Sequence, residues 1–142
     1  MKNQTKILTV FSFLLLAVII FTACTAKVDA TGKWADATYL SDTEFGKGSK
    51  TVTVTVKAEE NEVSFTIHSD ETYLGDALLE HKLVEGEEGE FGLYIKKVNG
   101  ILADYDVDKT YWGFYKNGEM MMSGVSSAEF ADGEQYELVL ES

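Results

Sequence analysis

Residues 50–67 read KTVTVTVKAEENEVSFTI, and their alternation decides the fold class. Valine and threonine alternate through the first half, so an extended chain would place the valines on one face and the threonines on the other. After a polar turn at residues 58–61, apolar and polar residues alternate again. The pattern predicts two half-buried strands paired as a hairpin. Their apolar faces consist of Val52, Val54, Val56, Val63, Phe65 and Ile67.

After the hairpin, the apolar residues recur with a longer period. Residues 69–72 include several side chains able to cap a helix, and apolar residues then recur at spacings of three and four. This spacing predicts one amphipathic helix that starts around Tyr73 and ends near Gly86. Residues 85–90 are predicted to form an acidic loop.

Further strands are predicted in the last third of the chain, at residues 91–95, 111–115 and 134–141. The pairs Asn99-Gly100 and Asn117-Gly118 are strong turn signals between them. The order is therefore a hairpin, a helix, and three or four more strands. It predicts an α+β fold, because the apolar faces close only if the single helix lies across one mixed sheet.

An export signal is predicted at the start of the chain. Lys2 and Lys6 precede a hydrophobic stretch over residues 7–21, and the composition changes abruptly after Cys24. The stretch supplies fifteen residues, fewer than the about 20 that a membrane-spanning helix needs. It resembles bacterial lipoprotein signals, in which two small residues precede a cysteine that receives diacylglycerol. Secretory cleavage after Ala26 is the alternative.

Cys24 is the only cysteine, so acylation would explain a thiol that cannot form an intramolecular disulfide. A free cysteine in an uncleaved signal is the alternative. Two acyl chains would hold the protein durably at the membrane. We therefore predict an extracytoplasmic protein that is lipid-anchored to the cell membrane. Residues 1–23 would form the signal peptide, residues 24–49 a tether, and residues 50–142 one domain.

The charge of the chain narrows the classes of partner. Without residues 1–23, ten lysines stand against 24 acidic residues, a net side-chain charge of −14, and the chain contains no arginine. Nucleic-acid binding needs a basic surface that displaces counterions, so the composition argues against a nucleic-acid partner. Acidity of this kind keeps an extracellular protein soluble.

Four groups of residues follow the predicted helix in a fixed order. They are Gly92, Tyr94, Ile95, Val98 and Gly100, then Tyr111-Trp112, then Met121-Met122-Ser123-Gly124-Val125, and last Asp132-Gly133-Glu134. In order and loop length they resemble the C-terminal domain of the transcobalamin and intrinsic factor family. The likeness is strongest to bacterial surface lipoproteins that carry that domain alone, a family of unknown function. With the preceding hairpin and helix, the resemblance covers residues 51–141.

The resemblance implies a ubiquitin-like β-grasp, with a mixed sheet of about five strands packed on one helix. It also implies a non-enzymatic module that binds a small ligand, with cobalamin or another corrinoid as the first candidate and no required cofactor. By motif, the corrin-facing positions fall on Tyr94, Ile95 and Met121, with Trp112 close by. An envelope transporter or carrier would be a partner of such a module.

Two of these positions have alternative interpretations. Trp112 also fits the core face of a strand. Three consecutive methionines cannot all face inward on one strand, so at least one of them should be exposed. Met121 or Met122 is the better candidate for contact with a ligand. A protein- or glycan-interaction domain at the envelope, suggested by the many tyrosines on predicted strands, is the second functional hypothesis.

The sequence offers little for catalysis or metal binding. It contains no nucleophile elbow and no glycine-rich phosphate loop. His68 and His81 lie on different predicted elements, which gives a zinc site little support.

A possible calcium loop fails on spacing. Asp104, Asp106 and Asp108 resemble the start of such a loop, but Lys109 stands where glycine is needed and Tyr115 where an acid is needed. A solvated acidic loop is the preferred interpretation, and binding of a hard cation is left open.

Overall fold

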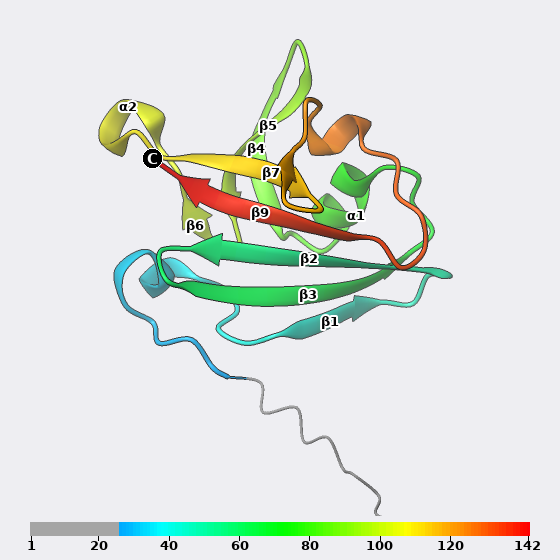
Figure 1. The fold of residues 1–142 in the computed structure, drawn as a ribbon, viewed down its shortest axis with the longest axis horizontal. Coiled ribbons are helices and arrows are strands. Elements are labelled where there is room, and N and C mark those ends of the chain that lie inside the picture. The colour runs from blue at the N-terminus through cyan, green and yellow to red at the C-terminus, as the bar shows by residue number, and fades with distance from the viewer. Residues whose placement is uncertain (1–25) are drawn as a thin grey trace, which may run out of the picture.

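The computed structural model describes residues 26–142 and arranges them in two β-sheets connected by short helices (Figure 1). In spatial order, the larger sheet contains β1 (Thr43–Gly46), β3 (Asn61–Ser69), β2 (Lys50–Ala58), β9 (Gln135–Glu141), β7 (Tyr111–Lys116) and β8 (Glu119–Met120). The smaller sheet contains β4 (Val84–Gly89), β5 (Gly92–Val98) and β6 (Ile101–Leu102). The helical segments are η1 (Gly32–Asp36), α1 (Leu74–Glu80), α2 (Tyr105–Asp108) and η2 (Val125–Ser127).

The predicted hairpin is confirmed. Strands β2 and β3 pair antiparallel, with Val54 opposite Phe65, and all six residues of the predicted apolar faces are at most 1% exposed. Burial of alternate side chains against the rest of the core stabilises both strands. In the larger sheet, the β2–β3 hairpin lies between β1 and β9.

Strand β9 joins the two halves of the larger sheet. It runs parallel to β2 and antiparallel to β7, and its Tyr136 and Leu138 are buried. The mixed α+β architecture is thus as predicted, but the prediction of about five strands in one sheet is wrong. The larger sheet has six strands and the smaller sheet has three. The ubiquitin-like β-grasp stays a prediction.

The predicted helix is shorter than expected. Helix α1 ends at Glu80, before the predicted end near Gly86, and the capping prediction for residues 69–72 is wrong. Instead, Ser69 Oγ accepts from the Glu71 backbone N–H at 3.1 Å. This hydrogen bond lies in the turn before α1 and does not cap the helix. Helix α1 buries Leu74, Ala77 and Leu78. The short α2 was not predicted.

The predicted acidic loop at residues 85–90 is wrong, because most of it forms strand β4. Five of the six residues of β4 are exposed, so no apolar alternation marks it in the sequence. Pairing with β5 stabilises it, together with a salt bridge of 2.8 Å between Lys96 Nζ and Glu87 Oε1. Figure 1 shows the tip of this hairpin standing clear of the larger sheet.

The predicted tether at residues 24–49 is also wrong over its described part. Trp34 is fully buried, and its Nε1 donates to the Ala58 carbonyl oxygen at 2.9 Å. Strand β1 pairs parallel with β3. The signal peptide at residues 1–23 and the lipidation of Cys24 lie outside the described residues and stay predictions. Among residues 26–142, no helix is long and apolar enough to cross a membrane.

Candidate ligand-binding site

The two predicted site residues on β5 face opposite ways. Ile95 packs against the hydrophobic core, whereas the side chain of Tyr94 is 55% exposed. Consecutive residues of a strand point to opposite faces of its sheet, so these two cannot contact one flat ligand together. The structure separates them.

Trp112 and Met121 belong to the inner side of the fold. Both pack against the core cluster, which favours the alternative interpretation of Trp112 as a core-face residue. The Met121 backbone N–H donates to the Phe114 carbonyl oxygen at 2.8 Å. Met122, by contrast, is fully exposed, so the prediction that one of the consecutive methionines is exposed is confirmed.

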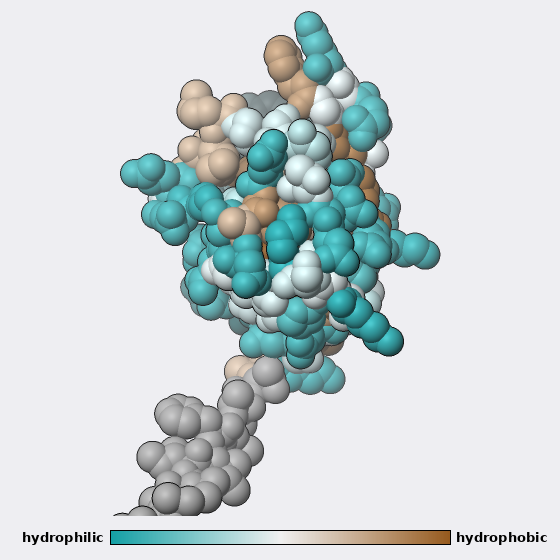
Figure 2. All heavy atoms as spheres, turned by 90° about the vertical axis from the view of Figure 1, so that its right-hand side faces the viewer, coloured by the Kyte–Doolittle hydropathy of each residue, from teal (hydrophilic) through white to brown (hydrophobic). Residues whose placement is uncertain are grey.

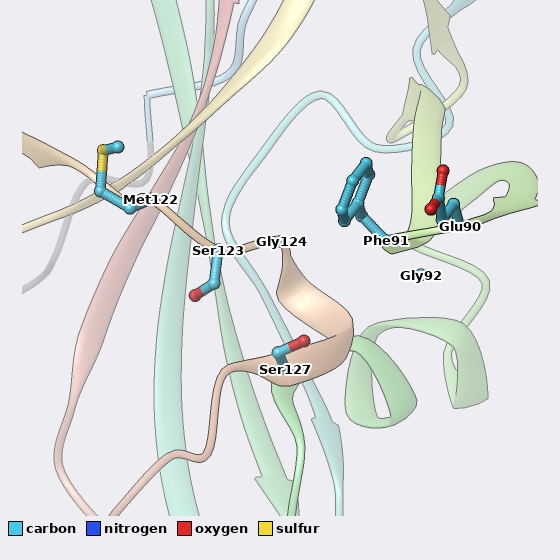
Figure 3. Close-up of a pocket in the computed structure, with 7 residues that line it drawn as sticks. All are labelled: Glu90, Phe91, Gly92, Met122, Ser123, Gly124 and Ser127. Carbon is cyan, nitrogen blue, oxygen red and sulfur yellow. The ribbon is translucent and has the colours of Figure 1, made fainter.

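Met122 lines a cavity of about 460 Å³, between the tip of the β4–β5 hairpin and residues 122–127. Phe91, at the hairpin tip, lines its other side and is 87% exposed. Figure 3 shows Phe91 and Met122 on opposite sides, with Ser123 and Ser127 between them in this view. Figure 2 shows hydrophobic surface at the top of the molecule, where Figure 1 places the hairpin tip, above a mostly hydrophilic face. We call this the hairpin cavity.

Glycine and serine hold the two sides of the hairpin cavity together. The Leu93 backbone N–H donates to Ser126 Oγ at 3.0 Å, which ties β5 to η2. Gly92 has a φ of +93°, and a Cβ at this position would lie 2.9 Å from the Ser126 Cβ. Only glycine fits this close approach without a shift. Gly124, in contrast, has extended backbone, and an added Cβ would meet no atom within 4 Å.

The lining suits a ligand with an apolar face and polar edges. Phe91 and Met122 offer apolar surface, and methionine adapts to irregular shapes. Ser123, Ser127 and Glu90 supply hydrogen-bonding groups beside them. Sequence reasoning missed Phe91, Glu90 and Ser127, because nothing local indicates that the hairpin tip lies opposite η2.

A second cavity of about 310 Å³ lies where β5 and β6 meet α2. Tyr94 lines it, together with Tyr105 of α2 and the Lys96–Glu87 ion pair. The hydrogen bond from Lys96 to Glu87 holds the pKa of the Lys96 ammonium above its ordinary value. We call this the tyrosine cavity.

Two of the three aspartates of the acidic segment, Asp104 and Asp108, serve the local fold. Asp104 caps α2 by accepting from the backbone N–H groups of Asp106 and Val107. Asp108 accepts from Lys33 Nζ at 2.6 Å, and this bond, with a second one from Thr110, holds the pKa of the Asp108 carboxyl well below its usual range.

The histidines also have structural neighbours. His68 pairs with Glu44, and the His81 ring stacks on Phe45 with ring centroids 5.3 Å apart. Among residues 26–142, no group of three or more His, Cys, Asp or Glu side chains is placed to hold a metal ion.

Comparison with known proteins adds a family and two solved structures. A domain of unknown function, DUF4430, matches residues 71–141. A protein of Ruminococcus gnavus ATCC 29149 that is proposed to bind metal has 36% sequence identity and a TM-score of 0.63, covering 66% of this chain and 98% of that chain. A search of curated proteins gives no match.

Haptocorrin in complex with Cbi is the second similar structure. It has 24% sequence identity and a TM-score of 0.50, over 69% of this chain and 26% of the haptocorrin chain. This likeness concerns the fold alone, and at that level it confirms the resemblance to transcobalamin-type domains.

Proposed function

Because this chain belongs to the DUF4430 family and contains an open cavity with an apolar rim, we propose that it is a non-enzymatic module that binds a small ligand in the hairpin cavity. The observation that carries the proposal is the position of Phe91 and Met122. Two large apolar side chains from segments about 30 residues apart are both exposed to solvent at one cavity. Such exposure has an energetic cost, which a ligand would remove.

A corrinoid is the first ligand to test. The cavity volume of about 460 Å³ lies within the range of roughly 300–1,000 Å³ that is typical of small-molecule sites. The haptocorrin complexed with Cbi has a similar fold, which supports this choice. The ubiquitin-like β-grasp is the finer fold assignment that goes with it.

A metal is not part of the proposal. The Ruminococcus gnavus relative is proposed to bind metal, but residues 26–142 of this chain bring no three metal-binding side chains together. In the acidic segment, Asp104 caps α2 and Asp108 pairs with Lys33.

The proposed location follows from the N-terminal sequence. Lipidation of Cys24 would display the module on the outer side of the cell membrane, where it could pass its ligand to an envelope transporter or carrier. The protein would then bind the ligand without changing it chemically.

The test is equilibrium dialysis of the full chain, in detergent, against cobalamin and against cobinamide, with corrin absorbance as the readout. Gly124→Leu should strongly weaken binding, because Gly124 lines the cavity on extended backbone and an added Cβ would meet no protein atom within 4 Å, which leaves room for the new side chain beside the ligand. Met122→Ala should weaken binding about 5- to 30-fold, the range for a buried apolar contact of roughly 1–2 kcal/mol. Met120→Ala is the matched control, because Met120 is 51% exposed and does not line the cavity.

Binding that survives Gly124→Leu would move the site away from the hairpin cavity. If neither corrinoid binds, nor any of a wider panel of tetrapyrroles and small nutrients, the small-ligand class is wrong. A pull-down that then recovers one envelope protein would favour the second hypothesis, an interaction domain without a small ligand.

A further inference from the structure

The tyrosine cavity is built independently of the hairpin cavity. Its lining comes from β4, β5, β6 and the start of α2, and it shares no lining residue with the hairpin cavity. Leu102 and Ala103 contribute apolar surface, and Ala103 is 7% exposed. The cavity of about 310 Å³ is at the lower end of the range for small-molecule sites, roughly 300–1,000 Å³.

Two tyrosine rings from different elements line this cavity. Tyr94 of β5 is 55% exposed and Tyr105 of α2 is 54% exposed. Exposed aromatic rings bind flat apolar surfaces with little loss of side-chain freedom, and the phenol hydroxyl adds a polar contact. The face of a pyranose ring that carries axial C–H groups is such a surface.

Hydrogen-bond donors and acceptors stand beside the rings. Lys96 Nζ donates to Glu87 Oε1 at 2.8 Å, and both side chains are well exposed, at 42% and 72%. An ammonium has three N–H donors and a carboxylate has about four acceptor sites, so each retains capacity after this one bond. Asp106 adds an exposed carboxylate at the cavity. A hydroxyl both donates and accepts, so a polyol can use the whole set.

The charges select against an anionic ligand. Glu87, Asp104 and Asp106 would repel an anion. An organic cation is the competing occupant, because three carboxylates stand against one ammonium, although Lys96 already pairs with Glu87 and Asp104 Oδ1 is bound by two backbone N–H groups of α2. A neutral polyol, unlike a cation, uses both the Lys96 donors and the carboxylate acceptors.

We infer that the tyrosine cavity is a second binding site, which takes a neutral saccharide stacked on Tyr94 and Tyr105 and hydrogen-bonded to Lys96 and Glu87. The site goes beyond the proposed corrinoid function and does not depend on it. It would give the protein contact with glycans while the hairpin cavity stays free.

The experiment is saturation-transfer NMR on the full chain in a polyoxyethylene detergent, which carries neither sugar nor amine. The probes are maltose, cellobiose and N,N′-diacetylchitobiose, with choline as a cationic comparison. At least one disaccharide should receive saturation at its ring C–H protons. Tyr94→Leu and Tyr105→Leu keep an apolar side chain but remove the flat ring, and each should weaken binding about 2- to 10-fold.

Two matched variants separate this site from other surfaces. Tyr111→Leu changes a tyrosine of β7 that is 38% exposed and outside the cavity, and it should leave saccharide binding unchanged. Gly124→Leu, which adds a side chain at the hairpin cavity, should also leave it unchanged. The inference is overturned if none of the three disaccharides receives saturation. It is also overturned if saccharide binding is unchanged in both Tyr94→Leu and Tyr105→Leu. Saturation of choline alone would make the cavity a site for organic cations instead.

Discussion

At the scale of single residues, Asn99 shows how one turn position joins distant parts of the chain. Its side-chain Oδ1 accepts from the Tyr39 backbone N–H at 2.9 Å, and its Nδ2 donates to the Tyr39 carbonyl oxygen at 2.8 Å. Its own backbone N–H donates to the Leu83 carbonyl oxygen at 2.8 Å. Asn99 is 1% exposed and has a φ of 51°, which asparagine tolerates better than most residues. One side chain thus holds the N-terminal segment against the smaller sheet.

Asn99→Gly should lower the free energy of unfolding by about 1–3 kcal/mol, because the turn conformation is kept but two buried hydrogen bonds are lost. Asn117→Gly is the matched control. Asn117 has a φ of 53° in the other Asn-Gly turn, but its side chain is exposed, so the change should stay within about 0.5 kcal/mol. Urea unfolding of both variants measures the difference. Equal effects would contradict the role given to the Asn99 side chain.

At the scale of elements, a polar network joins the ends of β7 and β9. Glu134 directly precedes β9 and accepts from Lys116 Nζ at 2.8 Å and from the Tyr136 hydroxyl at 2.6 Å. The Lys116 ammonium first, and the Tyr136 hydroxyl second, hold the pKa of the Glu134 carboxyl below its usual value of 4.5. The charged form of Glu134 is therefore stabilised in the folded state.

Because the pKa of Glu134 is lowered in the folded state, the stability of the fold should depend on pH. A carboxyl with a lowered pKa in the folded state stabilises the fold above its usual pKa of 4.5, and this contribution is lost as the pH falls below that value. Glu134→Gln should therefore lower the Tm at pH 7, and the gap to the wild type should narrow at pH 3. Thermal unfolding at both pH values tests this. Glu88→Gln, at an exposed position of β4, should give little change at either pH, and a constant gap for Glu134→Gln would contradict the network.

At the scale of the whole molecule, a strongly acidic chain follows a hydrophobic N-terminal segment. Without residues 1–23 the net side-chain charge is −14, and anionic headgroups would repel such a chain. A diacyl anchor outweighs that repulsion, because each methylene buried in the bilayer contributes roughly 0.8 kcal/mol. Attachment at Cys24 would keep the folded part at the membrane despite its charge.

Cys24→Ser should abolish incorporation of labelled lipid, and should either release the protein from the membrane fraction or leave an unprocessed precursor. Metabolic labelling with fatty acid, followed by fractionation, measures both effects. If the wild type takes up no lipid and its mature N-terminus maps to Lys27, the protein is secreted without an anchor.

The errors of prediction have one physical pattern. Strands β2 and β3 were predicted because alternate residues are buried against the core, which leaves a period of two in the sequence. Strand β4 has exposed residues at five of six positions, so only its pairing with β5 defines it. Strand β1 is likewise defined by pairing with β3. Partners distant in sequence leave no local signal.

The candidate sites divide in the same way. Sequence resemblance located the region of Met121 and Met122, but it placed Tyr94 and Ile95 on one surface and could not place Phe91 opposite Met122. Which methionine is exposed depends on where β8 ends and on the hydrogen bond from Met121 to Phe114, and these depend on the sheet.

The sequence by itself determined the features that depend on neighbouring residues. These are the central hairpin, both Asn-Gly turns with their positive φ angles, the α+β class and the acidic charge. Only the tertiary structure decided the number of sheets, the burial of Trp34 and the two cavities. The physical reason is that periodicity and backbone preference act within a few residues. A cavity, in contrast, forms where segments such as residues 90–92 and 122–127 are brought together by the packing of the whole chain.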